Sequence, residues 1–115
     1  MARPRLLVVE DDNFTRRVWE IIFGRRGWDV VVAETLAEGL RLLEPAPDYL
    51  ILDLLLPDGE GDAILRKVRE LGLETRVAVT TTIDDDWELD LVRSLCPELV
   101  LQKPMGVGDL WRERR

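Results

Sequence analysis

The sequence contains no histidine and only one cysteine, Cys96. The lack of histidine removes the commonest general base, the commonest zinc ligand and any Ser-His or Cys-His nucleophile pair. A single cysteine cannot form an internal disulfide, which fits a reducing cytoplasm. No run of 18 apolar residues is present and the N-terminal segment has no secretory layout, so we expect a cytoplasmic chain without a membrane span. Chemistry that needs a histidine or a pair of cysteines from this chain itself is therefore excluded.

Positive charge is also scarce. Lysine and arginine together number 16 against 23 acidic residues, which gives a net charge of −7. An acidic body repels the phosphate backbone of nucleic acid, so we expect no direct nucleic-acid binding. The basic segment 111–115, "WRERR", is interpreted as a solvated helix end. The length of 115 residues without a linker predicts one domain, residues 1–115, with a single core.

Short, almost unbroken apolar segments predict five strands, and continuous rather than alternating apolar strands are typical of a parallel sheet covered on both faces. The segments are 5–9, 28–33, 49–53, 76–81 and 98–102. Helical patterns lie between them, and a last short helix is predicted to begin at Asp109. The order predicts an α/β fold of five βα units with right-handed crossovers. The apolar residues predicted to face the core from the helices are Phe14, Val18, Ile21 and Ile22; Leu36, Leu40 and Leu43; Ile64, Leu65, Val68 and Leu71; and Trp87, Leu91, Val92 and Leu95.

Asp53 is the exception in an apolar run, within "YLILDLLLPDGEG" at 49–61. A charged side chain in a buried strand costs several kcal/mol unless something holds it. Because the predicted strand ends at this residue, we expect Asp53 to reach the edge of the sheet where the strands' carboxyl ends meet.

Polar side chains follow other predicted strands at the same edge. They are the acids 10–12 after the first strand, the threonines 80–82 at the end of the fourth, and Lys103 after the fifth. Crowded carboxylates repel one another unless a cation lies among them, and oxygen ligands without histidine or cysteine suit Mg²⁺. A hydroxyl and a lysine are typical partners of a phosphoryl group. The pattern predicts that Asp53 is a nucleophile that forms an aspartyl phosphate.

Each group also has a structural interpretation of its own. The acids after the first strand could cap a helix, a role that suits Asp12. The threonines are good strand formers, and "LPDG" fits a type I turn with Pro57 second and Gly59 fourth. Their occurrence together, in order and each at a strand end, favours the phosphoryl site.

These motifs resemble the response-regulator receiver domain of two-component signalling. The motifs are "LLVVEDD", "LILDLLLPDGEG", the fourth-strand hydroxyl and "LQKP". The resemblance implies a CheY-like, flavodoxin-like doubly wound fold with five parallel strands. It also implies that Asp53 accepts the phosphoryl group, that Asp11 ligates Mg²⁺ directly and Glu10 through water, and that the Leu55 carbonyl is a further ligand.

The same resemblance assigns the remaining positions. Lys103 would bind a phosphoryl oxygen, and Gly61 matches a turn glycine of the family. The usual spacing back from Lys103 gives Thr81 as the active-site hydroxyl, whereas an alignment on "VAVT" would choose Thr80. Thr82 then stands at the small-residue position. The donor would be a histidine kinase or phosphotransfer protein, since this chain has no histidine.

The sequence departs from the family where a tyrosine or phenylalanine usually precedes the lysine by three residues, because Val100 stands there. The segment "LCPEL" lacks the usual glycine, and the last helix is short. The face of the fourth helix, fifth strand and fifth helix is the family's usual surface for an output partner or a second copy, and here it would carry Trp87 and Trp111. We expect a signalling switch that catalyses only its own phosphorylation and dephosphorylation.

Two alternatives belong to other classes. A pseudo-receiver would use the same fold as a phosphorylation-independent interaction module, and Val100 favours it slightly. A phosphohydrolase with an aspartate nucleophile would carry a second aspartate two residues after Asp53. Leu55 occupies that position, which argues against such an enzyme.

Overall fold

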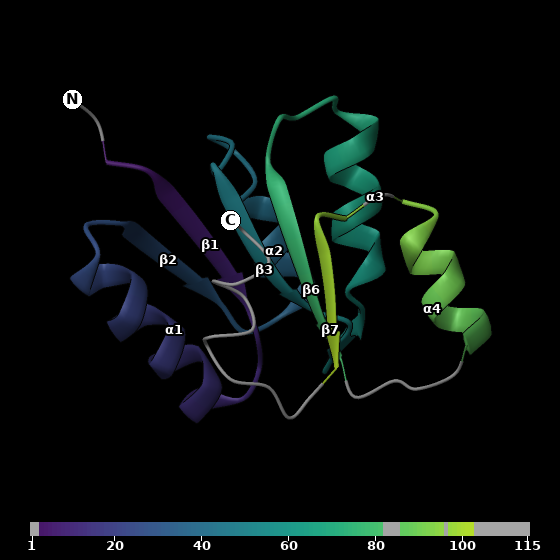
Figure 1. The fold of residues 1–115 in the computed structure, drawn as a ribbon, viewed down its shortest axis with the longest axis horizontal. Coiled ribbons are helices and arrows are strands. Elements are labelled where there is room, and N and C mark those ends of the chain that lie inside the picture. Colours follow the sequence, from purple (N-terminus) through teal and green to yellow (C-terminus); the bar gives the residue numbers. More distant parts are fainter. Residues whose placement is uncertain (1–2, 82–85, 96, 103–115) are drawn as a thin grey trace.

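A computed structural model describes residues 3–81, 86–95 and 97–102 (Figure 1). The described residues form β1 (Arg5–Val9), α1 (Asn13–Arg25), β2 (Asp29–Ala33), α2 (Leu36–Arg41), β3 (Tyr49–Asp53), β4 (Leu55–Leu56), β5 (Gly59–Glu60), α3 (Asp62–Glu70), β6 (Arg76–Thr81), α4 (Asp86–Arg93) and β7 (Leu99–Gln102). The five predicted strands are confirmed to within one residue at each end. The helix predicted from Asp109 lies outside the described residues.

The main sheet has five parallel strands in the order β2-β1-β3-β6-β7. The chain therefore winds one way from β1 to β2 and the other way from β1 through β3 to β7. This reversal makes the sheet doubly wound and places its switch point between β1 and β3. The carboxyl ends of these two strands are where such a sheet binds ligands.

Helices cover both faces of this sheet, as predicted (Figure 1). Because successive strand residues point to opposite faces, Leu6 and Val8 pack on the side of α1, while Leu7 and Val9 pack on the side of α3 and α4. Two cores result. The α1 core contains Leu6, Val8, Trp19, Phe23, Tyr49, Ile51 and Ala78, and the opposite core contains Leu7, Val9, Leu50, Leu52, Ile64, Leu65, Val68, Val77, Val79 and Val92.

The predicted core face of α1 is wrong at Phe14 and Ile21, whereas Val18 and Ile22 are half-buried. Phe14 is 77% exposed and Ile21 is 43% exposed, whereas Trp19 and Phe23 are buried. The helix carries apolar residues on more than one side, so its pattern allows two orientations. Trp19 and Phe23 lie one turn apart and contact each other edge to face, and burial of two large rings removes a large apolar area from water.

The other helices bury only part of their predicted faces. Leu40, Leu71 and Leu91 are exposed. α2 ends at Arg41 and α3 at Glu70, so Leu71 follows the end of its helix and turns to solvent. In α4, Leu89 joins Val92 as a buried residue. Across the described residues, no helix has both the length and the apolar character that a membrane span needs.

Candidate functional site

Two acids, Glu10 and Asp11, follow β1 and lie at the switch point of the sheet. The Glu10 N–H donates to the Ala33 carbonyl at 3.0 Å, which extends the β1–β2 pairing by one residue beyond Val9. The Glu10 side chain is buried, and its carboxylate accepts a hydrogen bond from the Asp12 N–H at 3.2 Å. Asp11 is exposed. The two neighbouring acids thus present one buried and one solvent-facing carboxylate.

Asp53 ends β3, which is held between β1 and β6. It pairs in register with Thr80, and only 4% of the residue is exposed. One of its carboxylate oxygens accepts a hydrogen bond from the Leu55 N–H at 3.1 Å. The central position of β3 and this bond fix the place of the carboxylate.

Glu10, Asp11 and Asp53 converge. One carboxylate oxygen from each lies within 4.8 Å of the others. Three like charges at this distance repel one another, and a hard divalent cation between them removes that repulsion. Oxygen donors alone suit Mg²⁺ rather than a softer metal. The three residues predicted as metal ligands through their side chains therefore form an acidic group that could hold such an ion.

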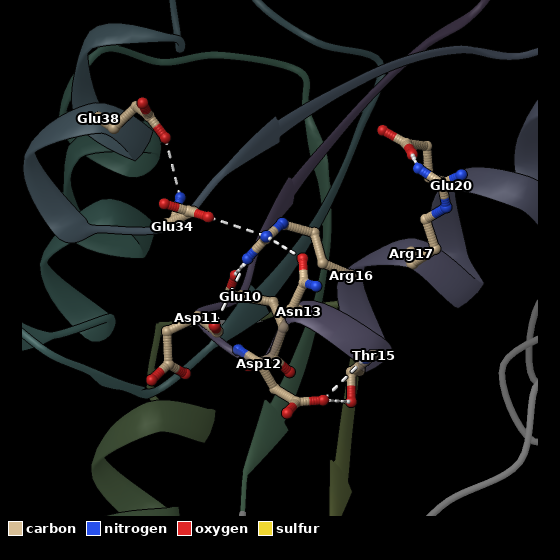
Figure 2. Close-up of polar contacts among 10 residues, drawn as sticks. All are labelled: Glu10, Asp11, Asp12, Asn13, Thr15, Arg16, Arg17, Glu20, Glu34 and Glu38. Atoms are coloured by element: carbon tan, nitrogen blue, oxygen red, sulfur yellow. Dashed lines mark hydrogen bonds and ion pairs between the residues drawn. The ribbon is translucent and has the colours of Figure 1, made fainter.

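Asp12 has a different role, which the sequence also suggested. It caps the N-terminus of α1, where its carboxylate accepts hydrogen bonds from the Thr15 N–H at 2.8 Å and from the Thr15 hydroxyl at 2.6 Å (Figure 2). The capping interpretation thus applies to Asp12 alone, and Glu10 and Asp11 remain in the acidic group.

The threonines of β6 lie beside Asp53. Thr80 and Thr81 are both buried, and the Thr80 carbonyl accepts from the Leu54 N–H at 3.2 Å. Thr81 is one residue nearer the carboxyl edge and pairs with Gln102 of β7. The choice of Thr81 over Thr80 as the active-site hydroxyl stays a prediction. Thr82 and Lys103 lie outside the described residues.

The segment after Asp53 folds back on itself. Leu55 and Leu56 of β4 pair antiparallel with Gly59 and Glu60 of β5, and this pairing closes the predicted turn. The Gly61 N–H then donates to the Leu54 carbonyl at 2.8 Å. A Cβ atom at Gly61 would overlap the carbonyl oxygen of Asp53, so only glycine fits there. The role of the Leu55 carbonyl as a metal ligand stays a prediction.

Two polar residues at this edge were missed by the sequence reasoning. Asp58 accepts hydrogen bonds from the Leu36 N–H at 2.7 Å and the Ala37 N–H at 3.1 Å, at the start of α2. These bonds hold the pKa of the Asp58 carboxyl below its ordinary value. Arg16, the second, is a buried cation on α1. The Asp58 bonds and the ion pair between Arg16 and Glu34 leave no signal in local sequence, because the partners are distant along the chain.

Val100, the departure noted in the sequence, lies in β7 opposite Val79 and is partly buried against the core on the side of α3 and α4. A small aliphatic side chain at this position is packed with the core. It offers no aromatic ring for a rotational switch.

Fold and site together define a class: a doubly wound α/β protein with an acidic group at the carboxyl ends of its central strands. The family model described as the response regulator receiver domain matches residues 6–113. The chain therefore belongs to the response regulator receiver domain family, and it is a receiver domain of two-component signalling rather than a conventional enzyme.

Curated relatives agree. The chain is 33% identical over 108 residues to the KDP operon transcriptional regulatory protein KdpE of Escherichia coli, covering 91% of this chain and 47% of KdpE. It is 33% identical over 112 residues to the response regulator protein PilR of Pseudomonas aeruginosa, covering 96% of this chain and 25% of PilR. The chain thus spans about half or less of the length of these relatives.

Solved structures also match. The non-phosphorylated HemR receiver domain of Leptospira biflexa superposes with a TM-score of 0.89 at 25% identity, covering 97% of this chain and 91% of that one. A CheY-like receiver domain protein of Methanospirillum hungatei gives a TM-score of 0.88 at 25% identity, covering 98% and 91%. The CheY-like fold predicted from the motifs is confirmed.

Proposed function

We propose that residues 1–115 act as a phosphoacceptor receiver domain that takes a phosphoryl group from a histidine of a partner kinase or phosphotransfer protein onto Asp53. The observation that carries this proposal is the convergence of Glu10, Asp11 and Asp53 at the switch point of the sheet. A cytoplasmic location is part of the proposal, since the matched relatives KdpE and PilR are bacterial regulators.

In the proposed reaction, an Asp53 carboxylate oxygen attacks phosphorus and the bond between phosphorus and the donor's histidine nitrogen breaks. The Leu55 N–H holds one carboxylate oxygen of Asp53 in place by its hydrogen bond. Asp53 is held in the strand, so the attacking atom is already positioned before the donor arrives.

The acidic group fits Mg²⁺ by its donor chemistry. Glu10, Asp11 and Asp53, with the Leu55 carbonyl, would hold the ion, which when bound supplies charge neutralisation for the phosphoryl oxygens. Thr81 and Lys103 are proposed to contact these oxygens as well. The same site would catalyse the slow hydrolysis of its own aspartyl phosphate.

The phosphorylated state would bias a two-state equilibrium at the surface of α4 and β7, where an output partner or a second copy would bind. Val100 favours one alternative, a pseudo-receiver that binds its partner without phosphorylation, because the usual aromatic switch is missing. The acidic group supports the phosphoacceptor instead, since a pseudo-receiver has no need of three converging carboxylates.

Intact-mass measurement after incubation with Mg²⁺ and acetyl phosphate tests the proposal. We expect the wild type to gain one phosphoryl group, and Asp53→Asn or omission of Mg²⁺ to abolish the gain. Asp90→Asn is the matched control, because Asp90 is an exposed acid on α4 far along the chain from the acidic group. No gain in folded wild type, with a donor that phosphorylates another receiver, would support the pseudo-receiver.

A further inference from the structure

The acidic group is flanked by a buried cation that no step of the proposed reaction uses. Arg16 extends from α1, and its side chain is only 10% exposed. Its guanidinium donates to the Glu10 carbonyl at 3.0 Å and contacts the Asp11 carbonyl at 3.4 Å (Figure 2). It also donates to the Asn13 side-chain oxygen at 2.7 Å and pairs with the Glu34 carboxylate at 2.8 Å.

These contacts fix the backbone of Glu10 and Asp11 and leave their carboxylates to the acidic group. The guanidinium contacts the main-chain oxygens of Glu10 and Asp11, while the Asp11 carboxylate points away from it (Figure 2). Fixing the two carbonyls restricts the backbone of Glu10 and Asp11, so their Cα–Cβ bonds keep their directions toward the acidic group before any ion binds. Groups that orient metal ligands in this way typically have large effects on metal affinity.

Glu34 balances the charge of the Arg16 guanidinium. It follows β2 and is largely exposed, so its carboxylate balances the buried guanidinium without entering the acidic group. The pair joins α1 to the segment after β2. Because the guanidinium charge is matched by Glu34, Arg16 fixes the acids without competing for their carboxylates. A lysine could not make the four contacts, since these need the planar fork of the guanidinium.

We propose that Arg16 is the positioning residue of the metal site, and that with Glu34 it sets the Mg²⁺ affinity of Glu10 and Asp11. This inference rests on the proposed phosphoacceptor function and deepens it. A merely structural role for Arg16 would stabilise α1 and leave the affinity for Mg²⁺ unchanged in the folded protein.

The test is a Mg²⁺ titration followed by amide chemical shifts, which report folding and the dissociation constant in one experiment. We expect Arg16→Met to raise the dissociation constant by about tenfold. Arg16→Lys should lie between Arg16→Met and wild type, and Glu34→Gln should weaken binding less than Arg16→Met. The matched control is Arg17→Met, because Arg17 is the next residue on α1, has the same charge and is 72% exposed.

The outcomes separate the two proposals. Wild-type affinity in folded Arg16→Met, or an equal loss in Arg17→Met, would overturn the positioning role and leave the proposed function intact. If Arg16→Met does not fold, Arg16→Lys and Glu34→Gln decide in the same way. A wild type that binds no Mg²⁺ would overturn the proposed function itself.

Phosphorylation gives an independent readout. The Mg²⁺ concentration for half-maximal phosphorylation by acetyl phosphate should rise in Arg16→Met by the same factor as the dissociation constant. The rate at saturating Mg²⁺ should stay within about twofold of wild type, since Arg16 acts on the arrangement of the ligands. A lower saturated rate with an unchanged half-maximal concentration would contradict the positioning role.

Discussion

At the scale of single residues, Asp53 explains the exception in an otherwise apolar strand. It is buried at the end of β3, but its carboxylate accepts a hydrogen bond and lies beside Glu10 and Asp11. Burial of a charge next to two others is costly, so the arrangement is sensible only where a cation is expected. The acids of this site were predictable because each lies at the end of a recognisable strand or within two residues after it.

Gly61 provides a prediction at this scale. Gly61→Ala should destabilise the domain by about 2 kcal/mol, because the new methyl group overlaps the Asp53 carbonyl oxygen and the end of β3 must shift. Urea unfolding measures the change. The same variant should be phosphorylated more slowly than wild type, since the displaced carbonyl belongs to Asp53, the proposed phosphoacceptor.

Gly24→Ala is the matched control for this variant. Gly24 lies within α1, and a Cβ atom there meets nothing within 4 Å. Alanine in a helix is favoured over glycine by roughly 0.5–1 kcal/mol, so this variant should be slightly more stable than wild type. Equal stability of the two alanine variants would contradict the predicted overlap between a Cβ atom at position 61 and the Asp53 carbonyl oxygen.

At the scale of secondary-structure elements, the strands were predictable and the helix faces were not. Buried parallel strands are continuous apolar runs, which few other elements imitate. α1 carries both the Phe14 stripe and the Trp19–Phe23 pair, and only packing against β1 and β3 selects between them. The Asp58 bonds to α2 and the pairing of Arg16 with Glu34 escaped prediction for the same reason, since these partners are distant along the chain.

The first turn of α2 gives a prediction at this scale. The Asp58 carboxylate accepts hydrogen bonds from the Leu36 and Ala37 N–H groups. These bonds lower the pKa of the Asp58 carboxyl from the ordinary value of 3.8. A pKa that is lowered in the folded state stabilises the protein at pH values above the ordinary pKa. That stabilisation is lost as the pH falls through the folded-state pKa.

Asp58→Asn should therefore be less stable than wild type near neutral pH. The difference in free energy of unfolding between the two proteins should shrink as the pH falls below about 3.8. Chemical unfolding across the range from pH 7 to about pH 3 measures it. A difference that stays constant with pH would mean that the carboxylate charge does not stabilise the start of α2.

At the scale of the whole molecule, negative charge is the dominant feature. The net charge of −7 is spread over a small domain, and three carboxylates meet at one point. Self-repulsion weakens a compact state, and a bound divalent cation relieves it locally. Stability should therefore depend on Mg²⁺ in a way that a monovalent salt does not reproduce.

Mg²⁺ at ten times its dissociation constant should add about 1.4 kcal/mol to the free energy of unfolding. For a domain of this size, the melting temperature should rise by roughly 4–6 °C. Asp11→Asn should lose most of this shift, whereas Asp90→Asn should keep it. Potassium chloride at equal ionic strength is the solution control, and an equal shift in that salt would assign the effect to screening rather than to a site.

The central claim is that the phosphoryl group is carried by Asp53. The most direct test is to phosphorylate the protein, reduce the acyl phosphate with borohydride and locate the modified residue by peptide mass spectrometry. Reduction converts a phosphorylated aspartate to homoserine, so we predict homoserine at position 53 and nowhere else. Homoserine at another acid, or its absence from a folded protein that has gained phosphate, would contradict the claim.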